Sequence, residues 1–463
     1  MSTTAATSLE RDLTALLGAE SVRPGTTRVY LSDATESRNL RGRADAIALP
    51  ADADAVARTV RWCYEHDVAI IPRGGGTGFT GGAVPLDGGV VLSLERLRKT
   101  RHLDPEFWRA AVEAGVVTAD LRRRARENGL FFPPDPGSAE QSQLGGNIAT
   151  NAGGPHAFKY GVTGAWITGL EVVLAPGELV RIGGPLRKDV AGYDLKSLMI
   201  GSEGTLGVVT AAWVKLIPAP EAALPLAALY PDSETGCAAI EAILASGIVA
   251  AAIEYLDAGA VEATRGAFPV ELPEDARFMV IADADGTAEE TARVHEELTE
   301  VLSDAALLVH APTGPKEISA LWRWRDGASL AVTAQRGGKV SEDIVVPIEH
   351  LQEAIDATVE IGRRHDLEAC SWGHAGDGNL HSTFMIDLDD PAELERAEHA
   401  AEDLFALAVA LGGSVSGEHG IGLVKNGQIA NQWAPAAVAM HEAIKRAFDP
   451  KGLLNPGKKL ARP

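Results

Sequence analysis

Two histidines, His374 and His381, flank a short turn-forming stretch late in the 463-residue chain. Asp377-Gly378 is a strong signal for a two-residue hairpin turn, which would place the two histidines directly opposite each other. Their Cβ atoms would then lie about 4.5–5.5 Å apart on one face, a spacing that suits two ligands of one ion. Glu418, within Gly417-Glu-His-Gly420, supplies a carboxylate. These three side chains predict one divalent metal with a position open to water or substrate.

The identity of the metal stays open, because imidazole and carboxylate ligands suit zinc, manganese, iron or cobalt about equally. An ordinary hairpin with two hydrogen-bonded histidines is the alternative to a metal site. Cys370 falls on the same face by alternation, and we interpret it as a packing residue. His419 adjoins Glu418, so a metal at Glu418 would carry it close enough to act as a general base. A further ligand and a cofactor contact are the other roles open to His419.

A glycine-rich stretch, Pro72-Arg-Gly-Gly-Gly-Thr-Gly-Phe-Thr-Gly-Gly82, follows the apolar run Val68–Ile71. Successive glycines let the backbone approach a ligand, and their N–H groups can line a concave site for a pyrophosphate. The pattern is neither the dinucleotide fingerprint that opens a helix nor a phosphate loop ending in Lys-Ser/Thr. A flexible surface loop is the alternative.

The elements around these motifs alternate between helices and short strands. Apolar residues at helical spacing predict helices over 8–17, 56–66, 237–245 and 288–302. Apolar runs predict strands over 68–71, 89–94, 170–174, 206–214 and 277–282. Residues 133–164, rich in Gly, Pro, Asn and Ser, predict a long loop, which is uncommon unless it binds something. Pro218-Ala-Pro220 marks a seam between two α+β regions.

The composition is that of an ordinary globular protein, with 46% hydrophobic and 23% charged residues. A formal net charge of −22 disfavours nucleic acid as a partner, although a local basic site can still hold a small anion. Cys63, Cys237 and Cys370 are too scattered to indicate a disulfide framework or a cysteine-ligated cluster. No apolar stretch reaches the about 18 residues of a membrane helix, and no secretory pattern opens the chain. We therefore expect a cytoplasmic protein, with attachment to the inner face of the membrane left open.

Several segments together resemble the flavoprotein family named for vanillyl-alcohol oxidase and p-cresol methylhydroxylase. The motifs that carry the resemblance are the glycine loop, Pro134–Ser138 with Gly145–Gly154, Gly192–Leu195 with Gly201–Gly207, Trp372–His381, and Gly417–Gly420 with Asn455–Gly457. The last two resemble the branch of D-lactate, glycolate and D-2-hydroxyglutarate dehydrogenases. The resemblance runs from about residue 47 to residue 458.

The resemblance implies an α+β fold with two lobes. After an N-terminal helical segment, 1–39, a PCMH-type FAD-binding domain would cover residues 40–220. An α+β substrate and metal domain of the FAD-linked oxidase C-terminal type would cover residues 221–463. The flavin ring would lie between the two domains, since clefts between domains are common ligand sites.

The resemblance also implies which residues hold FAD. They are Pro72, Arg73, Gly74, Gly75, Gly76, Thr77, Gly78, Gly81, Gly82, Pro134, Asp135, Pro136, Gly137, Ser138, Gly145, Gly146, Asn147, Thr150, Asn151, Gly153, Gly154, Tyr160, Gly161, Glu203, Gly204, Gly207, Val208 and Asn455. Some relatives attach FAD through a histidine in the first glycine loop. Residues 74–77 contain none, so noncovalent FAD is implied.

Substrate-binding residues are implied in the second domain. The family's substrate arginine aligns with Arg325, whose planar guanidinium can grip a carboxylate with two parallel hydrogen bonds. Ser329 follows at i+4 on the same face of the expected helix, and Lys339 aligns with a substrate lysine. Solvated surface groups are the alternative for both. Thr383 shares the face of His381, where relatives specific for 2-hydroxyglutarate carry an asparagine, and this departure puts a dicarboxylate substrate in doubt.

The expected reaction is FAD-dependent oxidation of a small D-2-hydroxy acid, D-lactate or glycolate, with D-2-hydroxyglutarate as the alternative. Arg325 would fix the carboxylate, the metal would bind the hydroxyl, and His419 would take its proton while hydride passes to flavin N5. An external acceptor would then take the electrons: a quinone, an electron-transfer flavoprotein, an iron–sulfur subunit or oxygen. A metal-dependent hydrolase and a non-catalytic flavin subunit are remote alternatives, and a homodimer is left open.

Overall fold

The computed structural model describes residues 8–38 and 40–460, and these divide into two compact units. Unit 1 comprises the residues up to 153, residues 162–219, and those from 418 onward; unit 2 comprises residues 154–161 and 220–417. The main boundary falls within the Pro218-Ala-Pro220 seam. The grouping differs from the sequence division in two places, since residues 154–161 pack with unit 2 and the segment after 417 packs with unit 1.

The first sheet of unit 1 contains the strand that leads directly into the glycine loop, β3 (Ile70–Arg73). Its order is β1 (Val22–Pro24), β2 (Ala46–Ala48), β4 (Val90–Ser93), β3 (Ile70–Arg73), with β2, β4 and β3 parallel. The helix α2 (Ala53–Glu65) packs against this core through Val56, Val60 and Cys63. It starts at Asp52, whose side chain accepts a hydrogen bond from a first-turn N–H.

A second sheet of unit 1 is fully antiparallel. Its order is β5 (Thr100–Asp104), β6 (Arg109–Glu113), β10 (Val208–Lys215), β8 (Ile167–Leu174), β9 (Glu178–Gly183). The central strands β8 and β10 are largely buried, whereas β9 is an edge strand that exposes polar residues. The end of the chain returns to the first sheet, where Leu454 forms a parallel bridge with Ile70.

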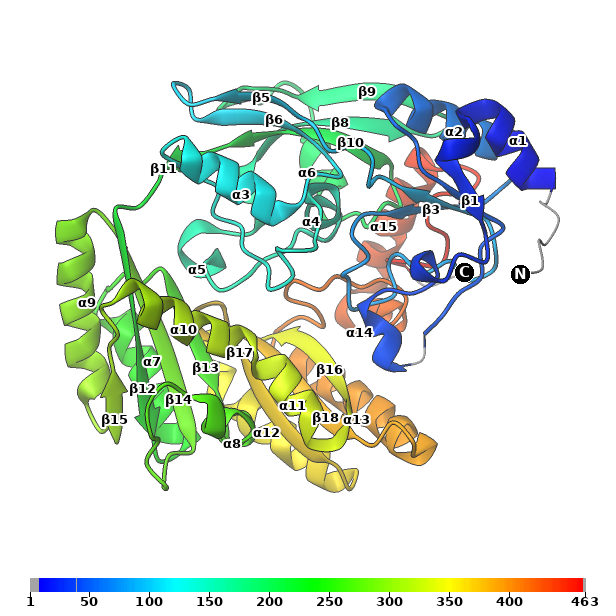
Figure 1. The fold of residues 1–463 in the computed structure, drawn as a ribbon. Helices are drawn as coiled ribbons and strands as arrows, with labels where there is room; N and C mark the ends of the chain where they lie inside the picture. The colour runs from blue at the N-terminus through cyan, green and yellow to red at the C-terminus, as the bar shows by residue number, and fades with distance from the viewer. Residues whose placement is uncertain (1–7, 39, 461–463) are drawn as a thin grey trace. The chain divides into compact units, whose positions relative to one another are not determined.

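Unit 2 is built on a seven-stranded antiparallel sheet (Figure 1). Its order is β15 (Leu308–His310), β12 (Ala222–Tyr230), β14 (Phe278–Gly286), β13 (Ala252–Leu256), β17 (Glu368–His374), β18 (Asn379–Ile386), β16 (Gly338–Val345). One face packs on α7 (Ser233–Ala245), α9 (Ala288–Ser303), α12 (Leu351–Arg364) and α13 (Pro391–Ala410). The other packs on α8 (Ala258–Thr264), α10 (Pro315–Asp326) and α11 (Ala328–Arg336).

Alternation along the strands decides which side chains reach each face. Tyr255 and Phe278 stack on each other with ring centroids 5.7 Å apart, and Phe278 contacts α7. Leu256, Met279 and Trp372 point the other way, into a core shared with α8, α10 and α11. The candidate catalytic residues of unit 2 lie on this second face.

The helices expected over 8–17, 56–66, 237–245 and 288–302 are present, as are the five expected strands, with ends shifted by a few residues. The long loop expected over 133–164 is wrong in part, because α4 (Leu144–Thr150) and α5 (Ala157–Tyr160) lie within it. A Cβ on Gly145 would lie 2.7 Å from the Cβ of Ala114. This glycine therefore serves the close packing of a helix rather than the flexibility of a loop.

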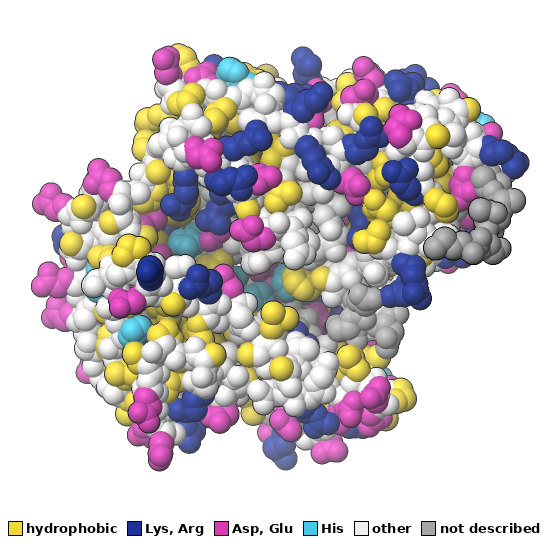
Figure 2. Space-filling view, in the orientation of Figure 1, with side chains coloured by type: hydrophobic (Ala, Val, Ile, Leu, Met, Phe, Trp, Pro, Cys, Tyr) yellow, Lys and Arg dark blue, Asp and Glu magenta, His cyan; other side chains and the backbone are white. Residues whose placement is uncertain are grey.

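The surface charge is unevenly distributed. Lys and Arg side chains gather over α3 (Thr118–Glu127) in Figure 2, and the helix itself carries Arg122, Arg123, Arg124 and Arg126. The net charge of −22 therefore does not describe every part of the surface. Among the described residues, no helix is long and apolar enough to cross a membrane.

Candidate active site

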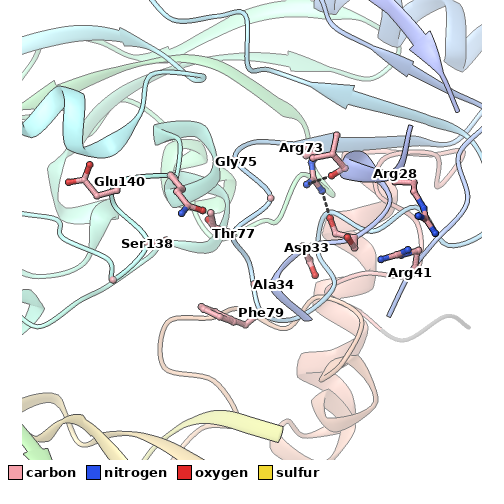
Figure 3. Close-up of a pocket in the computed structure, with 15 residues that line it drawn as sticks. Arg28, Asp33, Ala34, Arg41, Arg73, Gly75, Thr77, Phe79, Ser138 and Glu140 are labelled. Carbon is pink, nitrogen blue, oxygen red and sulfur yellow. Dashed lines mark hydrogen bonds between the residues drawn. The ribbon is translucent and has the colours of Figure 1, made fainter. Parts of the chain in front are cut away.

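The first glycine loop lines a cavity of about 620 Å³ in unit 1 (Figure 3). Gly75–Thr77 of this loop share the cavity wall with Gly137-Ser138 of the second glycine-rich segment, Pro134–Ser138 with Gly145–Gly154. Arg28 and Arg41 lie on the other side of the cavity. Within the described part of the chain, the backbone N–H groups from Gly75 to Phe79 donate no hydrogen bond. A run of unpaired N–H groups beside arginines suits an anionic pyrophosphate, so these residues fit the cofactor implied by the sequence.

The first and second glycine-rich segments pack backbone to backbone. A Cβ on Gly75 would lie 2.5 Å from the carbonyl oxygen of Gln141, and one on Gly74 would touch the backbone of Gly146 at 3.4 Å. Only glycine permits so close an approach at position 75. Arg73 connects the start of the glycine loop to an earlier segment of the chain. Its guanidinium donates to the carbonyls of Ser32 and Val29 at 2.7 and 2.9 Å.

Two expected cofactor residues of the second segment use their side chains to hold the chain. Asn147 donates to the hydroxyl of Thr118 at 2.7 Å. Asn151 adopts the left-handed conformation at φ 54° and accepts from the N–H of Gly164 at 2.8 Å. Their amides therefore shape the segment, and its backbone is the part left to face a ligand.

Glu203, in the third glycine-rich segment, Gly192–Leu195 with Gly201–Gly207, connects distant parts of unit 1. It is buried, and its carboxylate accepts from the N–H groups of Ile421 and Gly422 at 2.9 and 2.6 Å. Asn455 donates to the carbonyls of Glu203 and Gly82 at 2.7 and 2.9 Å. The loop that follows His419 is thereby fixed to the third segment, and the C-terminal segment is fixed to the first.

Three expected cofactor residues, Gly154, Tyr160 and Gly161, belong by contact to unit 2. Tyr160 donates its hydroxyl to Asp285 at 2.7 Å, and the Nζ of Lys159 lies 2.5 Å from the same carboxylate. Burial, reinforced by Asp285, raises the pKa of Tyr160. The Tyr160 hydroxyl therefore fastens this segment to β14.

The hairpin that carries the two histidines differs from the expected one. His374 is opposite Asn379, and His381 is opposite Trp372, so the direct pairing of the histidines is wrong. The turn is longer than two residues because Ala375–Asp377 forms a 3-10 turn before Gly378. The slip is even, so both histidines keep the same face, and their ring centroids lie 5.3 Å apart.

One buried carboxylate, Glu254, connects a candidate metal ligand to the candidate substrate arginine. Glu254 lies in the middle of β13, directly opposite His374 on β17, and has no exposed surface. Its Oε1 lies 2.6 Å from Nδ1 of His374, and its Oε2 forms an ion pair with Nη2 of Arg325. An imidazole bonded at Nδ1 presents Nε2 as its ligand nitrogen.

Arg325 is drawn into unit 2 by its place on α10. Leu321 and Trp324 of the same helix are buried, and the indole of Trp324 donates to the carbonyl of Thr264 at 3.1 Å. Arg325 is itself only 8% exposed. The helix ends at Asp326 and α11 starts after Gly327, so the expectation that Ser329 shares one helix with Arg325 is wrong.

Lys339 and Ser329 are in contact. The Lys339 ammonium donates to the hydroxyl and the carbonyl of Ser329 at 2.5 and 2.8 Å and lies 5.1 Å above the ring of Trp372. Burial lowers the pKa of Lys339 to about 8. Thr383 shares the face of His381 in the strand register, and its hydroxyl is 2.8 Å from that of Ser341.

Glu418 is placed by the residues just before it. The carboxylate of Asp343 accepts from the N–H of Gly417 at 2.9 Å and from the hydroxyl of Ser416 at 2.8 Å. Gly417, the residue directly before Glu418, is therefore held by a hydrogen bond to Asp343 of β16. His374, His381 and Glu418 each offer one ligand atom, and these atoms all lie within 4.8 Å of one another.

His419 lies close to the cavity that the first glycine loop lines in unit 1. Its ring is 4.6 Å from the ring of Phe79, which lines that cavity, and its carbonyl accepts from the hydroxyl of Thr80 at 3.4 Å. The side chain of Glu418 is held nearby, because a Cβ on Gly153 would lie 2.5 Å from its Oε2. Gly153 thus needs to be glycine for the second glycine-rich segment to approach this loop.

Sequence reasoning missed Glu254 and Asp343. Glu254 is the one acidic residue of an otherwise apolar strand, whereas Asp343 lies in a strand that also carries Lys339 and Glu342, and both carboxylates are fully buried. A charged residue in a strand that is buried on both faces needs a cationic or metal-linked partner. That signal was available for Glu254 in Ala252-Ile-Glu-Tyr-Leu256.

Comparison with known proteins agrees with this arrangement. Residues 44–183 match the family described as FAD binding domain, and residues 219–459 match FAD linked oxidases, C-terminal domain. The chain is 39% identical over 435 residues to the glycolate oxidase subunit GlcD of Bacillus subtilis, covering 94% of this chain and 92% of that protein. This chain belongs to the FAD-linked oxidase family. This FAD-linked oxidase is also 34% identical over 427 residues to a D-lactate dehydrogenase of Anaerostipes hadrus, covering 90% of each.

Solved structures share the fold of this FAD-linked oxidase. A p-cresol methylhydroxylase with bound substrate superposes with a TM-score of 0.80 at 19% identity, over 99% of this chain and 98% of that one. An alkyldihydroxyacetonephosphate synthase gives 0.76 at 19% identity, over 96% and 84%. The expected family, the PCMH-type FAD-binding domain and the FAD-linked oxidase C-terminal domain are confirmed, and the protein is an FAD-linked oxidoreductase.

Proposed function

We propose that this FAD-linked oxidase oxidises a small D-2-hydroxy acid, D-lactate or glycolate, to the 2-oxo acid. The observation that carries the proposal is the buried carboxylate of Glu254, which contacts Arg325 and His374 at once. A 2-hydroxy acid presents a carboxylate and a neighbouring hydroxyl, and these need a cation and a hydroxyl-binding group side by side. The names of the relatives, glycolate oxidase and D-lactate dehydrogenase, agree with such a substrate.

Arg325 holds the substrate carboxylate in this proposal. Its Nε and Nη2 are buried and donate no hydrogen bond to the described residues, and the contact of Nη2 with Glu254 is an ion pair. A buried donor left unpaired costs about 1–3 kcal/mol. A substrate carboxylate would satisfy Nε while Nη2 stays with Glu254. The guanidinium thus has one side anchored in the protein and another available to the ligand.

His374, His381 and Glu418 would hold one divalent ion, and the donor set suits zinc, manganese or iron equally. Two observations support this metal site. The three ligand atoms lie within 4.8 Å of one another, and Nδ1 of His374 contacts Glu254. Bound there, the ion would supply Lewis-acid stabilisation of negative charge on the substrate oxygen.

His419 accepts the hydroxyl proton, while the hydrogen on the substrate Cα departs with its electron pair. FAD, bound without a covalent link because residues 74–77 contain no histidine, supplies the hydride acceptor. The ring of His419 packs on Phe79 at the wall of the flavin cavity, which agrees with this role. Phe79 thereby limits the directions in which the imidazole can turn.

The two electrons then pass to an acceptor outside this chain: a quinone, an electron-transfer flavoprotein or an iron–sulfur subunit. An acceptor within this chain, such as an iron–sulfur cluster, would need cysteine ligands, but the three cysteines are free, buried and far apart in the sequence. Burial raises the pKa of Cys63 and of Cys237 to about 12, so neither readily becomes a thiolate ligand.

D-2-hydroxyglutarate is the second candidate substrate. Lys339 is a second, half-buried cation in unit 2, and it could bind a second carboxylate in place of its contacts with Ser329. Thr383 argues for the smaller acids, because its hydroxyl is already 2.8 Å from that of Ser341.

A panel of 2-hydroxy acids in both enantiomers, with an artificial dye as acceptor, tests the proposal. We expect dye reduction with D-lactate or glycolate and little with L-lactate. A protein that carries FAD but oxidises none of the panel would contradict the proposed function. Turnover confined to D-2-hydroxyglutarate would support the second candidate instead.

A further inference from the structure

We propose that Glu254 is a positioning residue that orients the metal ligand His374 and the substrate arginine Arg325 through one carboxylate. The inference rests on the proposed function, since it gives Glu254 a role in both the metal site and the substrate site. Glu254 itself would touch neither metal nor substrate.

The histidine half of the argument concerns tautomer and direction. Glu254 and His374 are directly opposite on adjacent antiparallel strands, a position that brings their side chains together. The 2.6 Å contact at Nδ1 keeps the proton on that nitrogen and presents the Nε2 lone pair for a ligand bond. A carboxylate partner also makes the imidazole a stronger donor to a metal.

The arginine half concerns the plane of the guanidinium. Because the five N–H donors of an arginine are coplanar and fixed relative to one another, anchoring Nη2 on Glu254 also sets the direction of Nε. The buried Nε–H would then point where a substrate carboxylate can accept from it. Without the anchor, Arg325 would keep its charge and lose its direction.

A simpler role, that of a counter-ion for Arg325, makes a different prediction. A counter-ion needs only a negative charge nearby, and the shorter side chain of aspartate would provide it. A bridge needs two oxygens at the reach of glutamate, so Glu254→Asp and Glu254→Gln should both impair it. The two variants therefore separate positioning from charge.

The test measures zinc binding directly. Holoprotein carrying FAD is stripped of metal with a chelator and titrated with Zn²⁺ against a chromogenic chelator. We expect Glu254→Gln and Glu254→Asp to bind Zn²⁺ roughly 10- to 100-fold more weakly than wild type, the usual effect of removing the partner of a ligand histidine. With Zn²⁺ at saturation, kcat should largely recover in both variants while the KM for D-lactate stays raised, because Arg325 is still unanchored.

Asp257→Asn is the matched control. Asp257 is another buried carboxylate, three residues further along, and it accepts from the N–H groups of Ser371 and Ala260 at 2.6 and 3.0 Å. Its loss should leave Zn²⁺ affinity and KM within threefold of wild type. If the single Glu254 variants do not fold, Glu254→Leu combined with Arg325→Met replaces the pair by apolar groups, and it should still bind Zn²⁺ more weakly.

The outcomes separate the two proposals. Wild-type Zn²⁺ affinity in the Glu254 variants, or wild-type behaviour of Glu254→Asp alone, would overturn the positioning role and leave the proposed oxidation intact. Weakened Zn²⁺ binding in a protein that oxidises no 2-hydroxy acid would support the positioning of His374 and refute the proposed function. A wild-type protein that binds no Zn²⁺, Mn²⁺ or Fe²⁺ would overturn the positioning role and the metal site, and the panel of 2-hydroxy acids would still decide the proposed oxidation.

Discussion

Replacing Arg325 by lysine keeps the positive charge and removes the planar guanidinium. In the structure, Arg325 is 8% exposed, paired with Glu254 through Nη2, and carries a buried Nε–H without an acceptor. Lysine can still neutralise Glu254 but cannot offer a second donor at a fixed angle to the first. Losing a desolvated contact between charges costs about 2–5 kcal/mol, so kcat/KM for D-lactate should fall roughly 30- to 4,000-fold, at 1.4 kcal/mol per tenfold.

The assay is kcat/KM with a dye acceptor, measured on D-lactate and on D-lactamide, which lacks the carboxylate. The penalty of Arg325→Lys should be large on the acid and nearly absent on the amide. Arg336→Lys on α11 is the control, because Arg336 is partly exposed and pairs with Glu393 at 2.7 Å; it should change kcat/KM by less than about 1 kcal/mol. An equal penalty on both substrates, or none on either, would show that Arg325 does not recognise the carboxylate.

Three further predictions concern the base, the lysine and the glycine loop. His419→Ala should slow flavin reduction in a single turnover roughly 10²- to 10⁴-fold with little change in substrate affinity, and unchanged reduction would assign the base elsewhere. Because burial lowers the pKa of Lys339 to about 8, its charge is lost as pH rises through that value. Wild-type kcat/KM for D-2-hydroxyglutarate, whose second carboxylate Lys339 would bind, should therefore decline above pH of about 8, and a Lys339→Met profile that declines in the same way would remove Lys339 from the substrate site. Gly75→Ala places a Cβ 2.5 Å from a backbone carbonyl and should lower the FAD content of purified protein, whereas Gly184→Ala meets nothing within 4 Å and should not; equal FAD content in the two would count against the loop's role.

Much of the fold follows from periodicity, and its failures have identifiable causes. The expected two-residue turn was wrong because Ala375–Asp377 coils into a 3-10 turn, and Gly378, at φ 67°, then reverses the chain. A slip of two residues preserves the face on which every side chain lies. The placement of His374 and His381 on one face therefore survived an incorrect pairing.

Ser329 illustrates the limit of helical spacing. An i+4 relation to Arg325 puts two residues on one face only when a single helix contains both, and α10 ends at Asp326. The contact of Ser329 with Lys339 comes from the packing of α11 on β16, which local sequence does not encode.

Residues that act through long-range contacts were the least accessible from sequence. Glu254 and His374 are 120 positions apart and meet only because β13 and β17 are neighbours in the sheet. Glu203 likewise holds the loop after His419 from more than 200 positions away. Of these residues, only Glu254 could have been identified from the sequence, because it is the one charged residue in an apolar strand.

Anaerobic reduction of the bound flavin by D-lactate, glycolate and L-lactate, before and after chelation, tests the central claim most directly. This measurement needs no knowledge of the electron acceptor, and it reports the hydride step alone. The account predicts that D-lactate or glycolate bleaches the flavin, that L-lactate does not, and that the chelated protein keeps its FAD but is not reduced. Flavin that is bleached by no 2-hydroxy acid, or that is bleached at the full rate after the metal has been removed, would contradict it.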